Sequence, residues 1–329
     1  MGAPPKASDE QITAAIRDGL TQAQILAKFD IALGTNSARR IRTLALRAGL
    51  QVAKGHTKST TLEMESERRV QEYLRPHGRR GFRLDNGVIL AFSDPHYWPG
   101  IKSTAHRAFL KFCRNMKPVC VINNGDALDG AQISRWPRIG WDSRPTVIQE
   151  LEAVTERLQE IEEAAGTRNL YWNLGNHDAR FETFLAAKAP EFQGVSGFHL
   201  KDHFPMWLPS WSIWVNDTLV VKHRFKSGIH ATHNNAMWAG KSMLTGHLHS
   251  LKVTPLSDYN GTRFGIDSGT LAQPYGPQFE DYMEDNPGNH RSGFVVLTFW
   301  KGRLLWPELA HVLDEDSGLV QFRGQVIEV

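Results

Sequence analysis

The chain has 329 residues, of which 41% are hydrophobic and 22% are charged, and its formal net charge is +3. This composition is ordinary for a globular protein with a substantial core, and no run approaches the ~20 apolar residues of a membrane span, so we expect no membrane partner. The opening residues MGAPPKASDE lack the apolar core of a signal peptide, and the two cysteines, Cys113 and Cys120, fall in apolar segments. We therefore expect a cytoplasmic protein whose thiols are buried and reduced, with a disulfide between them as the alternative.

The positive charge is concentrated near the N-terminus. Residues 1–60 contain nine lysines and arginines against four acids, a net charge of +5, which leaves −2 for the remainder. This asymmetry favours an anionic partner for the N-terminal segment.

Residues 1–55 are expected to form a small module of three helices. Ser8 with Gln11 is a capping box that begins the first helix, and Thr21 caps the second. In the third helix Ile41, Leu44 and Ala48 share one face. The candidate DNA-binding residues lie on another face of that helix or beside it: Arg39, Arg40, Thr43 and Arg47. A basic third helix is typical of a helix-turn-helix module, and the alternative is a three-helix bundle that packs on the main domain or binds protein.

Residues 56–80 are interpreted as a linker containing a helix that ends at Pro76, and residues 81–329 as the main domain. Its first segment, GFRLDNGVILAFSDPH, predicts a β-hairpin turning at Asp85-Asn86-Gly87. Strands and amphipathic helices then alternate until about residue 210, where a strand-rich region begins. This pattern predicts an α/β fold in which two sheets pack face to face with helices outside.

Polar residues of the types that bind metals follow each predicted strand. The segments are SDPH, NNGDALDG, GNHD, VKH and TGHLHS, in that order. Because ligand sites gather beyond the carboxyl ends of strands in α/β sheets, these segments are expected to meet at one edge. Each segment is weak evidence alone, but five of them at successive strand ends indicate one site.

The order D-x-H, GD-x-x-D, GNHD, H and GH-x-H resembles the calcineurin-like metallophosphoesterase superfamily, over residues 88–275. The resemblance implies a four-layer β-sandwich flanked by helices and two divalent cations, Mn²⁺ in the first place, with Fe, Zn or Ni as alternatives. It implies that Asp126 bridges both cations. The other implied ligands are Asp94, His96 and His249 at one site and Asn176, His223 and His247 at the other. We expect the D-x-H and H-x-H pairs on extended segments, where residues i and i+2 point the same way, and Gly125, Gly175 and Gly246 in tight turns.

The same resemblance assigns catalytic roles. His177 corresponds to the histidine that contacts the phosphate and protonates the leaving oxygen, and Asp129 to the carboxylate that orients it. The expected nucleophile is a metal-bound hydroxide that attacks phosphorus in line. Asp178 is expected to cap the following helix, with orientation of His177 as the alternative. Arg180 is a candidate phosphate contact or, alternatively, part of a surface ion pair.

A segment of mixed basic and aromatic residues separates GD-x-x-D from the next helix. Its candidate substrate-binding residues are Arg135 and Trp136, accompanied by Arg138, Trp141 and Arg144. Such a mixture can stack bases and hold phosphates, and ordinary loop packing is the alternative. His230 and His233 either line the substrate cleft or are ordinary surface residues.

Together these features predict a two-metal phosphodiesterase or nuclease that acts on DNA, similar to phage-encoded metallophosphoesterases and so active in a host cytoplasm. The main alternative is a phosphatase or phosphodiesterase of small-molecule or phosphoprotein substrates with an N-terminal module that does not bind DNA. A non-enzymatic DNA-binding regulator is a third hypothesis, which the complete ligand set and His177 argue against.

Overall fold

The computed structural model describes residues 6–32, 35–52, 78–135, 141, 144–283 and 286–329. The chain divides into two compact units, Met1–Met64 and Glu65–Val329, and each is considered by itself. The linking helix predicted before Pro76 lies outside the described residues. No described helix has both the length and the apolar character that crossing a membrane requires.

The first unit is the predicted three-helix module. Its helices are α1 Asp9–Arg17, α2 Gln22–Lys28 and α3 Thr35–Arg47. The predicted capping box of Ser8 is present, and Thr21 forms a second box with Gln24. Ile41 and Leu44 are buried as expected, but Ala45 is buried in place of Ala48, because α3 ends at Arg47 and Ala48 lies beyond its last turn.

The basic face of α3 is only partly available to a partner. Arg39, Thr43 and Arg47 are exposed. Arg40 instead donates from Nε to Asp9 Oδ1 at 2.9 Å and from Nη2 to the Ala7 carbonyl at 2.9 Å. Its guanidinium therefore joins α3 to the start of α1, which leaves three of the four predicted contact residues free of this role.

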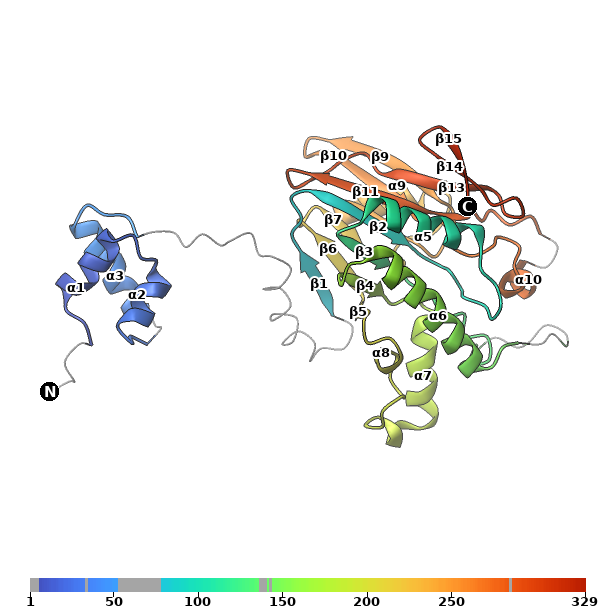
Figure 1. The fold of residues 1–329 in the computed structure, drawn as a ribbon, viewed down its shortest axis with the longest axis horizontal. Helices are drawn as coiled ribbons and strands as arrows, with labels where there is room; N and C mark the ends of the chain where they lie inside the picture. The colour runs from blue at the N-terminus through green and yellow to red at the C-terminus, as the bar shows by residue number, and fades with distance from the viewer. Residues whose placement is uncertain (1–5, 33–34, 53–77, 136–140, 142–143, 284–285) are drawn as a thin grey trace. The chain divides into compact units, whose positions relative to one another are not determined.

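The second unit contains two sheets among its described residues (Figure 1). The smaller has the order β1-β6-β7-β8-β10-β9: Arg79–Phe82, Ser212–Val215, Leu219–Val221, Ser242–Thr245, Gly261–Asp267 and Lys252–Asp258. The larger has the order β15-β14-β13-β11-β2-β3-β4-β5: Gln325–Glu328, Leu319–Phe322, Glu308–Asp314, Gly293–Trp300, Gly87–Phe92, Cys120–Asn123, Leu170–Asn173 and Leu208–Ser210, with β12 Arg303–Leu304 on β11. The helices are α5 Thr104–Met116, α6 Val147–Ala165, α7 Asp178–Lys188, η1 Pro190–Phe192, α8 Leu200–His203, α9 Ala231–Ala239 and α10 Pro277–Met283.

Helices cover both sheets, as the sequence predicted. Figure 1 shows α5 and α6 side by side over the larger sheet, where the Phe109 ring packs edge-on against Phe92 of β2 and Phe294 of β11. On the smaller sheet α9 packs on β8, β9 and β10. The sheets meet where Asn173 Nδ2 of β4 donates to the Val221 carbonyl of β7 at 2.9 Å. The fold is the predicted α/β sandwich of two sheets flanked by helices.

The predicted hairpin at Asp85-Asn86-Gly87 is wrong. β1 pairs in parallel with β6 in the smaller sheet, whereas β2 pairs with β3 and β11 in the larger one. Asn216 holds the segment that connects β1 to β2, because its side chain accepts from the Leu84 N–H at 2.7 Å and donates to the Leu84 carbonyl. The turn signal is real, but the two strands that it joins belong to different layers.

Cys113 and Cys120 are both buried and are not joined by a disulfide, as predicted. Burial raises the pKa of the Cys113 thiol to about 12, so it carries no charge at neutral pH.

Glu160 on α6 accepts from three donors: His106 belongs to α5, Lys102 to the segment before α5, and Arg157 to α6 itself. Its carboxylate accepts from His106 Nε2 at 2.8 Å, Lys102 Nζ at 2.7 Å and Arg157 Nη1 at 2.7 Å. The hydrogen bond from His106 and the two cations hold the pKa of Glu160 well below its usual range. A lowered carboxyl pKa stabilises the fold above the unfolded-state pKa of about 4.3, and this contribution is lost as the pH falls.

We expect Glu160→Gln to lower the free energy of unfolding by about 2 kcal/mol at pH 7 and by much less at pH 3. Denaturant unfolding at both pH values measures this. Glu156→Gln is the control, since Glu156 is an exposed carboxylate of the same helix that also contacts Arg157. An equal loss at both pH values would contradict the role of the charge.

Candidate metal centre

The predicted site residues converge from five segments. Asp94 and His96 follow β2, Asp126 and Asp129 follow β3, and Asn176 and His177 follow β4, three adjacent parallel strands of the larger sheet. His223 follows β7, and His247 and His249 follow β8, which are adjacent parallel strands of the smaller sheet. The site therefore lies where the carboxyl ends of strands from both sheets meet.

Six of the seven predicted ligands form two clusters. The candidate ligand atoms of Asp94, His96 and His249 all lie within 4.8 Å of one another, and so do those of Asp126, His223 and His247. His223 Nε2 is 3.1 Å from Asp126 Oδ2 and 4.0 Å from Asp94 Oδ1, so it connects the two. Asp126, the predicted shared ligand, lies in the second cluster, and His223 Nε2 is the atom that lies near carboxylates of both clusters.

Two buried atoms indicate that a cation fits this site. Asn176 Oδ1 and His223 Nε2 have no hydrogen-bond partner among the described residues. His223 Nδ1 donates to the Asn124 carbonyl at 2.7 Å, which places the lone pair of neutral imidazole on Nε2, facing Asp126. A lone pair facing a carboxylate, beside an amide oxygen that lacks a donor, is costly unless a cation lies between them.

The charges of the cluster shift its pKa values strongly. Burial alone would lower the pKa of His223, but the carboxylates of Asp126 and Asp94 outweigh it and raise the pKa to about 10, so His223 Nε2 holds a proton at neutral pH unless a cation takes its place. Burial would raise the pKa of Asp94, but His249 and His223 hold it at about 2. Both carboxylates are therefore ionised at neutral pH and can act as oxygen ligands.

The backbone at the ligands differs from our expectation. The D-x-H and H-x-H pairs are not extended, because both residues of each pair have left-handed backbone: φ is 52° at Asp94, 39° at His96, 70° at His247 and 54° at His249. Asp126 also has a positive φ, 54°. These strained conformations point the side chains of short loops at one another, and strain of this kind is concentrated at functional sites.

The glycines next to the ligands allow close approach more than they allow turns. Only Gly125 has a positive φ, 99°. A Cβ at Gly175 would lie 1.9 Å from Asp126 Oδ1, and one at Gly246 would lie 2.5 Å from Asp94 Oδ2. Glycine is therefore the only residue type that fits at positions 175 and 246, next to the two carboxylates.

His177 lies at the mouth of the site, at the N-terminus of α7. Its Nδ1 donates to the main-chain carbonyl of Asp129 at 2.7 Å, and the Asp129 carboxylate is 3.4 Å away. That carboxylate is closer to His96 Nδ1, at 3.0 Å. Asp129 therefore orients two histidines, His177 mainly through its backbone and His96 through its side chain. Burial would lower the pKa of His177, but Asp126 and Asp129 raise it.

Arg180 contacts the predicted acid directly. Its Nη1 donates to the Asp129 carbonyl at 2.8 Å, and its Nη2 donates to His177 Nε2 at 3.2 Å. The guanidinium thus lies beside the ring nitrogen of His177 that Asp129 leaves open. This position favours the predicted contact with an anionic substrate over the alternative of a surface ion pair.

Asp178 does not cap α7, which corrects the prediction. His177 occupies the N-cap position, and Asp178 is buried. Its carboxylate accepts five hydrogen bonds of 2.8–3.1 Å, from the main-chain N–H groups of Asp126, Ala127, Leu128 and Gly175 and from the Trp172 indole. It therefore holds the loop that carries Asp126 against the loop that carries Asn176.

We expect Asp178→Asn to lower the free energy of unfolding by about 3 kcal/mol, because its amide group would face N–H donors that need an acceptor. Denaturant unfolding measures the change. Asp202→Asn is the control, since Asp202 accepts the Gly197 N–H at an exposed position. Equal stability of both variants would mean that the five hydrogen bonds contribute little.

Of the predicted basic and aromatic insert, the structure describes Arg135, Trp141 and Arg144. Trp136 and Arg138 lie outside the described residues, Arg135 is exposed, and Trp141 is fully exposed. Arg144 Nη1 donates to the Ala131 carbonyl at 3.1 Å, which is loop packing. Of the two further histidines, His230 is exposed and His233 is half-buried.

Two residues beside the site were not predicted. The His290 ring is centred 4.4 Å from the His249 ring, and the buried Phe279 ring lies 5.3 Å from the rings of both His96 and His249. Burial, followed by the charges of His249 and His96, lowers the pKa of His290 to about 4. Neither residue belongs to a spaced motif, so the sequence carries no signal for them.

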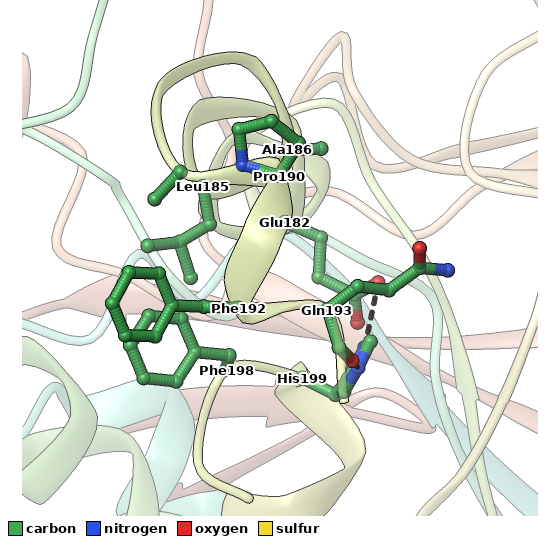
Figure 2. Close-up of a pocket in the computed structure, with 9 residues that line it drawn as sticks. Glu182, Leu185, Ala186, Pro190, Phe192, Gln193, Phe198 and His199 are labelled. Atoms are coloured by element: carbon green, nitrogen blue, oxygen red, sulfur yellow. Dashed lines mark hydrogen bonds and ion pairs between the residues drawn. The ribbon is translucent and has the colours of Figure 1, made fainter. Parts of the chain in front are cut away.

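A separate pocket of about 240 Å³ lies between α7, η1 and the segment before α8 (Figure 2). The rings of Phe192 and Phe198 are stacked there at 5.2 Å, and His199 Nε2 donates to the Gln193 carbonyl at 2.6 Å. The pocket contains none of the predicted site residues, and its lining is mostly apolar.

Comparison with known proteins places the chain in a family. Residues 87–267 match the sequence model of the family described as calcineurin-like phosphoesterase. No curated protein matches the chain. Solved structures similar to it include a single mutant of Vps29 from Entamoeba histolytica, with 13% identity, coverage of 74% of this chain and 99% of that one, and a TM-score of 0.39. Others are the phosphoesterase Yfce from E. coli (15% identity, coverage 67% and 97%, TM-score 0.30) and a protein serine/threonine phosphatase from Saccharomyces cerevisiae (11%, 90% and 96%, 0.35).

Proposed function

Because the chain belongs to the calcineurin-like phosphoesterase family and is a hydrolase of phosphoester bonds, we propose that it is a two-metal phosphodiesterase that cleaves DNA. The observation that carries this proposal is the convergence of six of the seven predicted ligands into two clusters that share a boundary at His223, which lies near both Asp126 and Asp94. The family uses a binuclear divalent metal centre, and the residues present fit one.

Each cation has a defined set of candidate ligands. Asp126 would serve both, with Asp94, His96 and His249 on one side and Asn176, His223 and His247 on the other. When bound, two divalent cations, Mn²⁺ in our proposal, neutralise charge on a phosphate and lower the pKa of water. The mixture of carboxylate, amide and imidazole ligands suits Mn²⁺ as well as Fe, Zn or Ni.

His177 is the proposed acid for the leaving oxygen. Its Nδ1 is held by the Asp129 carbonyl, so Nε2 is the atom that can deliver a proton, and a proton on Nε2 would replace the hydrogen bond that this atom accepts from Arg180. The neighbouring carboxylates of Asp126 and Asp129 favour the protonated ring. The proposed role of Arg180, beside Nε2, is to bind a phosphate oxygen next to the transferred proton.

Support for DNA as the substrate comes from the N-terminal unit. Residues 1–60 carry a net charge of +5, and Arg39, Thr43 and Arg47 are exposed at the spacing of one helix face. A phosphodiester polymer matches both this charge and the chemistry of the metal centre.

We expect the full-length protein to hydrolyse bis-p-nitrophenyl phosphate and plasmid DNA with Mn²⁺, and to lose both activities with EDTA. Absence of turnover with Mn²⁺, Fe²⁺, Zn²⁺ and Ni²⁺ would refute the metal-dependent enzyme. Cleavage of the small diester without cleavage of single- or double-stranded DNA would move the substrate to small molecules or phosphoproteins.

Binding of DNA by the N-terminal unit is tested in EDTA, where no hydrolysis occurs. Arg47→Gln should weaken duplex binding and reduce the salt dependence by about one counterion, whereas Arg17→Gln, an exposed arginine of α1, should do neither.

A further inference from the structure

A continuous stretch of the second unit contains no acidic residue. Residues 218–257 include five lysines and arginines and five histidines but no aspartate or glutamate. At the chain's average of 35 acids in 329 residues, a stretch of this length would contain about four. Three of its histidines, His223, His247 and His249, are predicted metal ligands, so this acid-free segment contributes to the site.

Part of this stretch forms an exposed surface of cations and aromatic rings, here called the 224–238 surface: Arg224, Phe225, Lys226 and Trp238. Phe225 is 45% exposed and Trp238 is 66% exposed. Lys226 Nζ lies near both, 5.4 Å from the Phe225 ring centre and 4.9 Å from that of Trp238. The two rings and the cation therefore form one patch, although they come from a loop and from α9.

The loop that carries this surface is held in place. The Lys226 N–H donates to Oδ1 of the buried Asn235 at 2.9 Å, and Lys252 Nζ donates to the Ile229 carbonyl at 2.8 Å. Two exposed aromatic rings, one on this fixed loop and one on α9, with a lysine near both, form a contiguous patch that a ligand can cover.

The surface begins at the metal centre. Arg224 and Phe225 are the two residues after His223, so their Cα atoms lie within about 7.6 Å of the Cα of that ligand. The surface therefore starts close in the chain to a proposed metal ligand.

We infer that the 224–238 surface binds a single strand of nucleic acid that leads into the metal centre, with unpaired bases stacked on Phe225 and Trp238 and phosphates at Arg224 and Lys226. An exposed aromatic side chain stacks on the face of a base, and in a duplex the neighbouring base pairs cover those faces. The surface therefore fits an unpaired strand better than paired DNA. The absence of acids over residues 218–257 matches a polyanion. This inference rests on the proposed phosphodiesterase function and specifies the form of its substrate.

The test is fluorescence anisotropy of the full-length protein with fluorescein-labelled (dT)₁₂ in EDTA. Trp238→Ala should raise Kd by about tenfold without changing its salt dependence, as expected for the loss of one stacked base. Lys226→Gln should reduce the slope of log K against log salt by about 0.7, as expected for the loss of one phosphate contact.

The matched controls are Trp300→Ala and Lys301→Gln, because Trp300 is 54% exposed and Lys301 Nζ lies 4.5 Å from its ring in the other sheet. They should change neither Kd nor slope. Wild-type affinity in both test variants would overturn the inference, and so would an acidic phosphopeptide that competes as well as unlabelled (dT)₁₂.

Photo-crosslinking distinguishes binding of the oligonucleotide at the 224–238 surface from binding by the basic N-terminal unit. A 5-iododeoxyuridine 12-mer should crosslink to Phe225 or Trp238 in the wild type, and crosslinks confined to residues 1–64 would overturn the inference. The proposed function fails separately, through absent Mn²⁺-dependent turnover of bis-p-nitrophenyl phosphate by the wild type.

Discussion

Replacing His177 by glutamine should lower the rate of diester hydrolysis by about 10²- to 10⁴-fold while metal content remains at the wild-type value. Glutamine retains a polar group but cannot deliver a proton. The loss should be larger for an alkyl phosphodiester than for the p-nitrophenyl diester, because an alkoxide leaving group needs a proton and p-nitrophenolate needs little help. Initial rates on both substrates, with metal content measured on the same samples, check this.

His230→Gln is the matched control, since His230 is an exposed histidine of the 218–257 segment. It should retain metal and change neither rate. Loss of metal in His177→Gln would instead identify His177 as a ligand. An equal loss of rate with both leaving groups would show that His177 binds the phosphate without protonating the leaving oxygen.

The site could be predicted from sequence to the extent that it depends on topology. Parallel strands place their carboxyl ends at one edge, so polar residues after β2, β3 and β4 had to meet. Hydrophobic periodicity and capping residues are local signals, and they predicted the two sheets and the three N-terminal helices. Pairing of β1 is not local: Asn216, more than 130 residues away, holds the segment that carries the chain between the sheets.

Two features of the site could not be predicted from the sequence, and each has a physical reason. The left-handed backbone at Asp94, His96, His247 and His249 contradicts the residues' own preferences, and only the surrounding fold imposes it. The role of Asp178 depends on main-chain N–H groups of a loop some 50 residues earlier. Main-chain donors have no sequence signature, so a carboxylate at a helix start was read as a cap.

Replacing Asp126 by asparagine should have the largest effect on the metal centre itself. Asp126 Oδ2 lies 3.1 Å from His223 Nε2, and Oδ1 accepts the His177 N–H at 2.7 Å. An amide of the same shape removes the negative charge that both cations would share. We expect fewer than two metal ions per chain and a fall in turnover of at least about 10²-fold, since changes that only support ligands already cost 10- to 100-fold.

Thermal unfolding gives a measure of this loss that does not depend on activity. A metal that binds only the folded chain stabilises it by about 2.7 kcal/mol at 100 times Kd, so Mn²⁺ should raise the unfolding temperature of the wild type over EDTA. That rise should be reduced or absent in Asp126→Asn and retained in Asp217→Asn, an exposed aspartate of the same unit. If Asp126→Asn kept the full rise and two metal ions, the cations would be held without a shared carboxylate. Asp94, His96 and His249 would then have to bind one cation without any contribution from the Asp126 cluster. The short distance of 4.0 Å between His223 Nε2 and Asp94 Oδ1 argues against that separation.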